Sequence, residues 1–282
     1  MNDLNPAAIR QSFDRAARHY DEGAVLQRAV ADELLSRFQW LRIAPRTLLD
    51  VGTGTGYALP LLRRRFRSAH VLACDIAWGM ASAARRRRVL WRKTPVWVAD
   101  GHDLPLRPES VDCIYSSLAL QWMDPKRAFA EFRRVLRQDG LLTFATFGPD
   151  TLREMRAAWA QVDDRPHVHT FVDMHDLGDA LVDSGFADPV LDVERYTLTY
   201  ESVGALMRDL KRIGAHNAAT GRFPGLTGKE RYRRFKQSYE MFRHEGRLPA
   251  TYEVVYGQAW VPPGAPAPVS LGDRRVIPIR GV

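Results

Sequence analysis

The stretch LLDVGTGTG, from Leu48 to Gly56, decides the fold of this chain. Its apolar start has the composition of a buried strand, and Gly52, Gly54 and Gly56 then form a turn before a helical segment. Because glycine lacks a Cβ, such a turn lets backbone amides approach a ligand closely. A dinucleotide-binding turn has the spacing G-x-G-x-x-G/A, whereas the sixth position here is the bulky Tyr57. The turn therefore predicts a bound cofactor. Its spacing makes a dinucleotide a weaker candidate for that cofactor without excluding it.

Apolar runs alternate with helical segments around this turn. The candidate strands are residues 47–52, 70–75, 95–100, 111–117, 140–148, 189–200 and 250–261. Helical spacing and stop signals predict helices at 58–66, 80–90, 126–136, 151–162 and 174–184. This alternation favours parallel strands joined by crossover helices. We therefore expect an α/β fold with a doubly wound, mostly parallel seven-stranded sheet.

Three segments lie outside the expected sheet. Residues 6–40 have an apolar helical face and predict an N-terminal helical cover. Between the last two strands, 204–213 and 228–242 are the strongest helical segments and predict a lid beside the sheet. The Pro- and Gly-rich end is typical of a flexible tail. The expected division is a cover (1–46), a sheet domain (47–200 with 250–261), a lid (201–249) and a tail (262–282).

The composition is that of an ordinary folded protein. The 282 residues are 45% hydrophobic and 26% charged, which excludes a disordered, collagen-like or coiled-coil chain. No window approaches the roughly 18 apolar residues of a membrane span, and Asp3 and Asp14 stand where a signal peptide is apolar. Cys74 and Cys113 lie in apolar runs and indicate buried thiols rather than a disulfide or metal pair. We expect a cytoplasmic protein.

The chain is basic, with 41 Lys and Arg against 33 Asp and Glu and a formal net charge of +8. Such a balance fits a nucleic acid, an anionic membrane surface or an acidic protein as partner. Charge alone does not choose among these partners.

Two acidic residues end later strands. Asp75 lies where a carboxylate accepts hydrogen bonds from the hydroxyls of a ribose. Asp100, followed by Gly101, is placed to accept from an adenine amino group, although a helix cap or turn explains an Asp there equally simply. Together these positions suit an adenosine cofactor.

The glycine turn with these two acids resembles the pattern of class I S-adenosylmethionine methyltransferases over residues 47–148. The resemblance implies that the turn lies against the methionine part of S-adenosylmethionine, that Asp75 binds its ribose and that Asp100 lies beside its adenine. The cofactor-binding residues it implies are Gly52, Thr53, Gly54, Gly56, Asp75, Ile76, Asp100, Gly101 and Ser117.

The segment after the fourth strand narrows the acceptor. Enzymes that methylate bases or amides carry an Asn/Asp-Pro-Pro-aromatic motif there, whereas this chain has SSLALQW, Ser116 to Trp122. Together with FDRAARHYDEGAVLQR, VDDRPHVHTF, MRDLKRIGAHN and LPATYEVVYG, this segment resembles the malonyl-acyl-carrier-protein O-methyltransferases of biotin synthesis. The Pro-rich tail past Trp260 departs from that pattern. Because the Asn/Asp-Pro-Pro-aromatic motif is absent, a methyltransferase that acts on bases or amides is disfavoured despite the positive charge.

This second resemblance implies transfer of a methyl group to the free carboxylate of malonyl-carrier protein or malonyl-coenzyme A. A carboxylate is already ionised at neutral pH, so the reaction needs no general base. It does need in-line positioning and exclusion of water, which suits a lid. Arg208 and Lys211, on the predicted lid helix, are the candidates to orient the carboxylate.

Further candidates carry simpler alternatives. Tyr20 and Gln27 either close over the cofactor or form a packing face. Gln121 and Trp122 follow a strand end and are expected to line the substrate channel, with a core role as the alternative for Trp122. His167 and His169 have metal-ligand spacing, but without a third ligand we expect them to be structural or solvated and expect no metal site.

An acidic acyl carrier protein would explain the charge. The runs Arg85 to Arg88 with Arg92 and Lys93, and Arg231, Arg233, Arg234 and Lys236, are the candidate docking surfaces, with solvated helix faces as the alternative. We expect a monomer that binds neither nucleic acid nor membrane. Two other functions stay open: a small-molecule O- or C-methyltransferase with a quinone-type acceptor, and a non-enzymatic protein that kept the fold.

Overall fold

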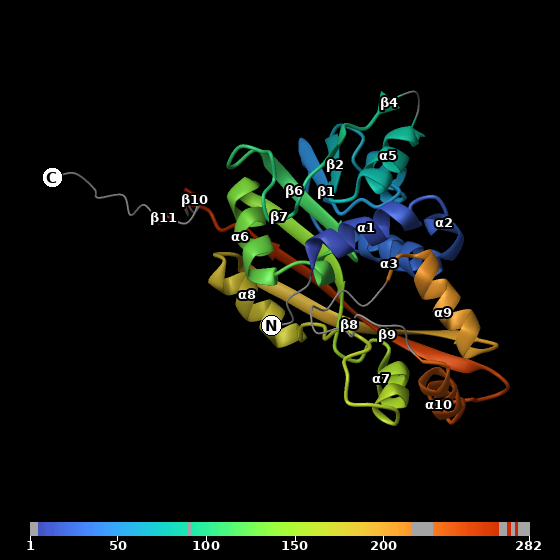
Figure 1. The fold of residues 1–282 in the computed structure, drawn as a ribbon. Helices are drawn as coiled ribbons and strands as arrows, with labels where there is room; N and C mark the ends of the chain where they lie inside the picture. Colours follow the sequence, from blue (N-terminus) through green and yellow to red (C-terminus); the bar gives the residue numbers. More distant parts are fainter. Residues whose placement is uncertain (1–4, 90–91, 216–227, 265–269, 272–273, 276–282) are drawn as a thin grey trace.

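The computed structural model describes residues 5–89, 92–215, 228–264, 270–271 and 274–275. Its centre is a seven-stranded sheet with the order β5-β2-β1-β6-β7-β9-β8 (Figure 1). The strands are β1 (Thr47–Val51), β2 (His70–Asp75), β5 (Val96–Val98), β6 (Val111–Ser117), β7 (Leu136–Phe147), β8 (Ala187–Tyr200) and β9 (Leu248–Trp260). The first five run parallel, and β9 pairs antiparallel with both β7 and β8. The predicted doubly wound, mostly parallel sheet is confirmed.

The burial of each strand follows its place in the sheet. The central β1 is buried from Leu48 to Val51 because helices cover both faces, whereas residues of the edge strand β8 alternate in exposure. One core packs α3 (Val25–Ser36) and α4 (Ala58–Arg65) on one face of the sheet. A second core packs α6 (Pro125–Val135) and α8 (Met174–Asp183) on the other.

The N-terminal cover is helical as predicted, but it is broken into pieces. It consists of α1 (Pro6–Ala16), α2 (Tyr20–Gly23), α3 and the 3-10 turn η1 (Arg37–Trp40). Asn5 caps α1 by accepting from the amides of Ala7 and Ala8, and Pro6 occupies the first turn. The breaks fold α1 back, so that it packs against α5 (Trp78–Arg86).

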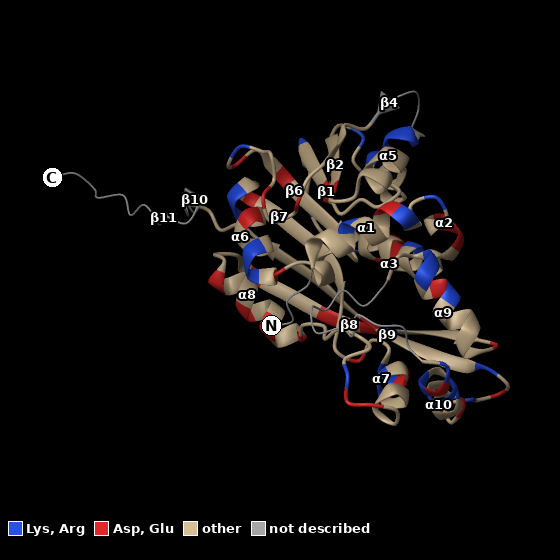
Figure 2. Ribbon diagram, in the orientation of Figure 1, with Lys and Arg blue, Asp and Glu red and all other residues tan. Residues whose placement is uncertain are grey.

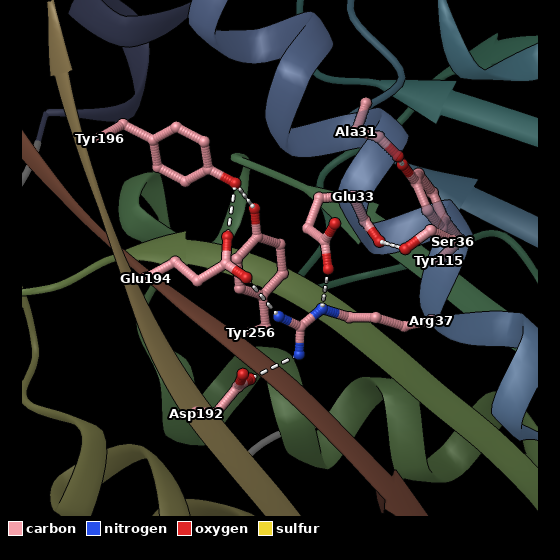
Figure 3. A network of polar contacts seen from close by, with 9 residues as sticks. All are labelled: Ala31, Glu33, Ser36, Arg37, Tyr115, Asp192, Glu194, Tyr196 and Tyr256. Atoms are coloured by element: carbon pink, nitrogen blue, oxygen red, sulfur yellow. Dashed lines mark hydrogen bonds and ion pairs between the residues drawn. The ribbon is translucent and has the colours of Figure 1, made fainter.

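Arg37 joins this cover to the far edge of the sheet (Figure 3). Its guanidinium donates to Asp192 at 2.6 Å, Glu33 at 3.1 Å and Glu194 at 3.2 Å, and it lies 4.0 Å from the centre of the Tyr256 ring. The contacts therefore connect η1 with α3 and with both antiparallel strands.

Two predicted boundaries were wrong. The helix expected at 80–90 ends at Arg86, because the chain turns into the paired segments β3 (Arg88–Val89) and β4 (Arg92–Lys93). The strand expected at 140–148 begins earlier, at Leu136, which pairs with Val111 directly after α6 ends at Val135.

In the described part of the chain between β8 and β9, where a lid was predicted, there are two helices. They are α9 (Val203–Arg212), which contacts α2, and α10 (Lys229–Glu240), which packs on α7 (Arg153–Ala160). Of the predicted tail, 270–271 and 274–275 form a short antiparallel pair, β10 (Ser270–Leu271) with β11 (Arg274–Arg275). Most of the tail lies outside the described residues, so its predicted flexibility stays a prediction. Within the described ranges no helix is long and apolar enough to cross a membrane.

Candidate active site

The glycine turn lies at the carboxyl ends of the parallel strands. The amides of Gly52 and Thr53 donate to the carbonyl of Cys74 at 2.9 and 3.0 Å, which holds the turn against β2. Gly52 has a φ of +74°, and a Cβ there would lie 2.2 Å from Cβ of Ala119. Gly54, with a φ of +56°, has no atom within 4 Å of the place its Cβ would take. The turn thus leaves open space beside Gly54 for a ligand.

Asp75 lies directly beside this turn. Its buried carboxylate accepts from the amides of Gly54 and Ala77, both at 2.9 Å. Burial raises its pKa to about 6, partly offset by these two hydrogen bonds. The carboxylate is ordered by the backbone before any ligand binds.

Asp100 faces the same cleft from the end of β5. It accepts from the amide of His102 at 2.9 Å and from Nδ1 of His102 at 2.7 Å. Because Nε2 of His102 accepts from the amide of Asp124 at 2.9 Å, the ring proton is on Nδ1. The hydrogen bond from His102 lowers the pKa of Asp100 to about 2. Asp100 thus stabilises a turn, which was the simpler explanation for an Asp at this position. Its ionised carboxylate also lines the cleft.

The cleft collects most of the predicted cofactor residues. Those that line it are Gly52, Gly54, Asp75, Ile76, Asp100, Gly101 and Ser117. Thr53 lines a smaller hollow behind the turn, where its hydroxyl donates to the buried Asp50 at 2.6 Å. Gly56 lines neither space and packs against Ala84. These two residues shape the turn rather than the cleft.

Sequence reasoning missed the cover of the cleft. Pro6, Ile9 and Phe13 of α1 line it, as do Met80 and Met123. The sequence predicted a helical cover at residues 6–40 but placed none of these side chains in the cofactor site, since nothing local shows where α1 folds back.

A larger cavity of 620 Å³ adjoins the cleft. The residues that line both spaces are Phe13, Tyr20, Leu118 and Trp122. The rings of Phe13 and Trp122 meet edge to face at 5.4 Å. The predicted pocket residues Tyr20 and Trp122 therefore stand at the junction of the cleft and the cavity.

The other predicted pocket residues also line this cavity. Gln27 is on α3 and Tyr20 on α2, so the two do not share one helix face as the sequence suggested. The side-chain amide nitrogen Nε2 of Gln121 donates to the backbone carbonyl of Leu118 at 2.7 Å and thus stabilises the loop after β6. Burial and the nearby Asp75 and Asp21 raise the pKa of the Tyr20 phenol, which stays protonated.

The cavity is electrostatically one-sided. Arg208 and Lys211 line it from α9, as predicted for the lid helix. Of the residues that the structure describes, no Asp or Glu lines it. The cavity thus offers cations to an anion without a competing carboxylate.

His169 is a pocket residue that the sequence reading discounted. It is 6% exposed, lines the cavity and lies with its ring 5.0 Å from that of Trp122. Its Nε2 is buried and has no hydrogen-bond partner in the described part of the chain. Burial and the charge of Arg156 lower its pKa to about 4, so the ring is neutral. His169 is therefore buried rather than solvated, and its role, structural or in the pocket, stays a prediction.

His167 also lines the cavity, and contacts with its neighbours hold its ring in place. It stacks on Trp159 at 3.6 Å and hydrogen-bonds Asp163 at 2.8 Å. Across the described residues, no group of three or more His, Cys, Asp or Glu is placed to hold a metal ion.

The predicted docking runs are largely engaged within the protein. Arg85 donates to the carbonyl of Val96, and Arg87 pairs with Asp21 at 2.6 Å. On α10, Arg233 pairs with Glu230, and Arg234 donates to the carbonyl of Gln161. The side chains of Arg88, Arg92 and Lys93 lie outside what the structure describes.

Comparisons with known proteins agree with this geometry. A family model described as "Methyltransferase domain" matches residues 49–144. A malonyl-[acyl-carrier protein] O-methyltransferase from Laribacter hongkongensis is 54% identical over 92% of this chain and 90% of its own length. The chain belongs to the malonyl-[acyl-carrier protein] O-methyltransferase family. A more distant member of this family, from Legionella pneumophila, is 36% identical over 97% of this chain and 96% of its own.

Solved structures show how widely the fold of this family is shared. The YcgJ protein from Bacillus subtilis superposes with a TM-score of 0.57 at 15% identity, covering 84% of this chain and 99% of its own. The [4+2]-cyclase SpnF superposes at 0.53 with 20% identity, covering 84% and 82%. At these identities the likeness concerns the fold alone, so the activity has to be argued from the site.

Proposed function

We propose that this protein transfers the methyl group of S-adenosylmethionine to the free carboxylate of malonyl-acyl-carrier protein. The product is the malonyl methyl ester that primes pimeloyl formation in biotin synthesis. One observation carries the proposal: the cavity beside the cleft presents Arg208 and Lys211 and, among its described lining residues, no carboxylate. The names of the relatives agree with this acceptor.

The cleft suits the methyl donor. Asp75 is placed for the ribose hydroxyls, Asp100 for the adenine amino group, and the space at Gly54 for the methionine part. When bound, S-adenosylmethionine supplies a methyl group on a positively charged sulfur. The acidic Asp75 and Asp100 at this end of the sheet complement a cationic ligand.

The acceptor needs no proton removed from it. A malonyl carboxylate is ionised at neutral pH. Neither Tyr20, which stays protonated, nor His169, with a pKa of about 4, is suited to take a proton from a phenol. The site therefore fits a carboxylate better than a phenolic or quinone-type acceptor.

The residues of the cavity act by positioning. Arg208 and Lys211 hold the carboxylate by charge, and Nε2 of His169, which is buried and has no partner among the described residues, is a further candidate to hydrogen-bond the substrate. Tyr20 and Trp122 frame the junction, where the carboxylate oxygen and the methyl carbon come to about 3 Å. The aromatic walls exclude water from this path.

The direct test is methyl transfer from isotopically labelled S-adenosylmethionine. Purified protein is offered malonyl-carrier protein, succinyl-carrier protein, malonyl-coenzyme A and a phenolic acceptor in parallel, and the products are followed by mass. We expect a methyl ester on the malonyl carrier. Donor binding with product only on the phenol would replace the proposal by small-molecule methylation. No donor binding at all would favour a non-enzymatic protein.

We further propose that the protein works as a monomer in the cytoplasm and binds neither nucleic acid nor membrane. The acidic carrier protein then accounts for the net charge of +8. Light scattering after gel filtration tests the monomer, since a dimer would double the measured mass.

A further inference from the structure

A second hollow opens beside the substrate cavity. It is a groove of 800 Å³ between α1 and α9. Four residues, Phe13, Trp122, Arg208 and Lys211, line both the groove and the cavity. The groove therefore adjoins the cavity, and the contacting rings of Phe13 and Trp122 form part of the wall between them.

The groove is lined by cations that are not engaged elsewhere. Arg15 on α1 and Arg208, Lys211 and Arg212 on α9 are all exposed, and their side chains form no hydrogen bond or ion pair with any residue the structure describes. One carboxylate, Glu22, lines the groove, and it pairs with His19. Figure 2 shows Lys and Arg along α9 toward the end that lies beside α2.

This arrangement contrasts with the two basic runs singled out from the sequence. Of those runs, Arg85, Arg87, Arg233 and Arg234 bind carbonyls or acids of the protein itself. The cations of the groove have no such partner among the described residues, and two of them, Arg208 and Lys211, also line the cavity. Arg15 and Arg212 are close to helix C-termini, where a cation also stabilises the helix dipole. A test must separate that effect from docking.

We propose that this groove between α1 and α9 is the docking surface for the acidic carrier protein, whose acyl arm reaches the adjoining cavity past Arg208 and Lys211, which line both hollows. The proposal rests on the proposed function, because it takes its partner from the malonyl-carrier substrate. Acidic side chains of the carrier meet Arg15 and Arg212 at the rim, while Arg208 and Lys211 lie deeper along the path. Charge at a rim acts mainly on association and weakens with salt.

The test compares Arg15→Gln/Arg212→Gln with the wild type at low and high salt. We expect KM for malonyl-carrier protein to rise about three- to tenfold at low salt, as for two exposed ion pairs, with kcat unchanged and a flatter salt dependence. The matched control is Arg10→Gln/Arg18→Gln, which removes the same charge near the same helix outside the groove. We expect a smaller rise of KM in that control.

Malonyl-coenzyme A serves as a substrate that has the arm and lacks the carrier protein. Its KM should rise less than that of malonyl-carrier protein in the groove variant, and an equal rise would overturn carrier docking there. An equal rise of KM for malonyl-carrier protein in the groove and control variants would mean that only the net charge matters, and this result would also overturn carrier docking in the groove. If the double variant unfolds at a lower temperature, Arg212→Gln alone provides the same comparison with only one helix end changed. A wild type inactive on malonyl-carrier protein would instead refute the proposed function.

Discussion

Asp50 is a buried carboxyl that, unlike an ordinary Asp, keeps its proton up to near-neutral pH. It lies at the carboxyl end of β1, where burial raises its pKa to about 7 despite the hydrogen bond from Thr53. The folded state thus favours the protonated form. Its stabilising effect is complete below about pH 4 and is lost as the pH rises toward 7.

Asp50→Asn should remove the contribution of Asp50 to the pH dependence of the unfolding free energy. Between pH 5 and pH 8 the wild type should lose a few kcal/mol of unfolding free energy through Asp50, and the variant should lose less, by about 2 kcal/mol. Urea unfolding at both pH values measures the difference. Asp179→Asn, on the surface of α8, should behave like the wild type. An equal slope for Asp50→Asn and wild type would show that Asp50 does not titrate in this range.

His169 gives a prediction about the reaction itself. His169→Phe keeps a ring in the cavity wall but removes Nε2, which we propose as a hydrogen-bonding group for the substrate. We expect kcat/KM for malonyl-carrier protein to fall about tenfold, the effect of one hydrogen bond, while the melting temperature and the affinity for S-adenosylhomocysteine stay the same. His169→Gln, which keeps a polar terminus, should recover part of the loss. Equal activity of His169→Phe and wild type would assign His169 to packing alone.

At the scale of elements, the turn between β1 and α4 separates folding from ligand binding. Gly54→Ala places a methyl group in open space, in a left-handed backbone conformation that costs about 1 kcal/mol. Gly52→Ala adds a clash with Ala119. We expect Gly54→Ala to fold and to bind S-adenosylhomocysteine at least tenfold more weakly by calorimetry, and Gly52→Ala to be clearly less stable as well. Full ligand affinity in Gly54→Ala would place the cofactor away from the turn.

The connection between η1 and strands β8 and β9 rests on Arg37. Arg37→Ala removes three ion pairs and a ring contact from a half-buried site and should lower the unfolding free energy by about 1 to 2 kcal/mol. Arg37→Lys should fall in between, because an ammonium group cannot form the same planar fork. Arg42→Ala, an exposed neighbour, is the control for urea unfolding. No loss in Arg37→Ala would mean that solvent replaces the network without cost.

At the scale of the whole molecule, the two ligand spaces are closed by segments far apart in the chain. α1 covers the cleft and α9 walls the cavity, so ligand contacts hold both to the sheet. S-adenosylhomocysteine at 100 times its Kd should therefore stabilise the folded protein by about 2.7 kcal/mol. Thermal unfolding with and without the ligand measures the shift, and Gly54→Ala should show little of it. A wild type without a shift would contradict a ligand site in this cleft.

The sequence by itself determined the sheet, the glycine turn and the acids beside it. Each depends on local pattern: apolar runs of strand length, glycines at fixed spacing, and Asp75 and Asp100 where parallel strands end at one edge. Even the pocket role of Arg208 and Lys211 followed from their place on a lid helix next to a recognisable motif.

Only the tertiary structure decided which charges are free and which polar atoms face a cavity. Arg87 and Arg15 look alike in sequence, yet Arg87 has Asp21 as a partner and Arg15 faces an open groove. His169 becomes a pocket residue because Trp122 and α9 close around it. The physical reason is that desolvation and ion pairing depend on neighbours brought together by folding, and no local pattern records them.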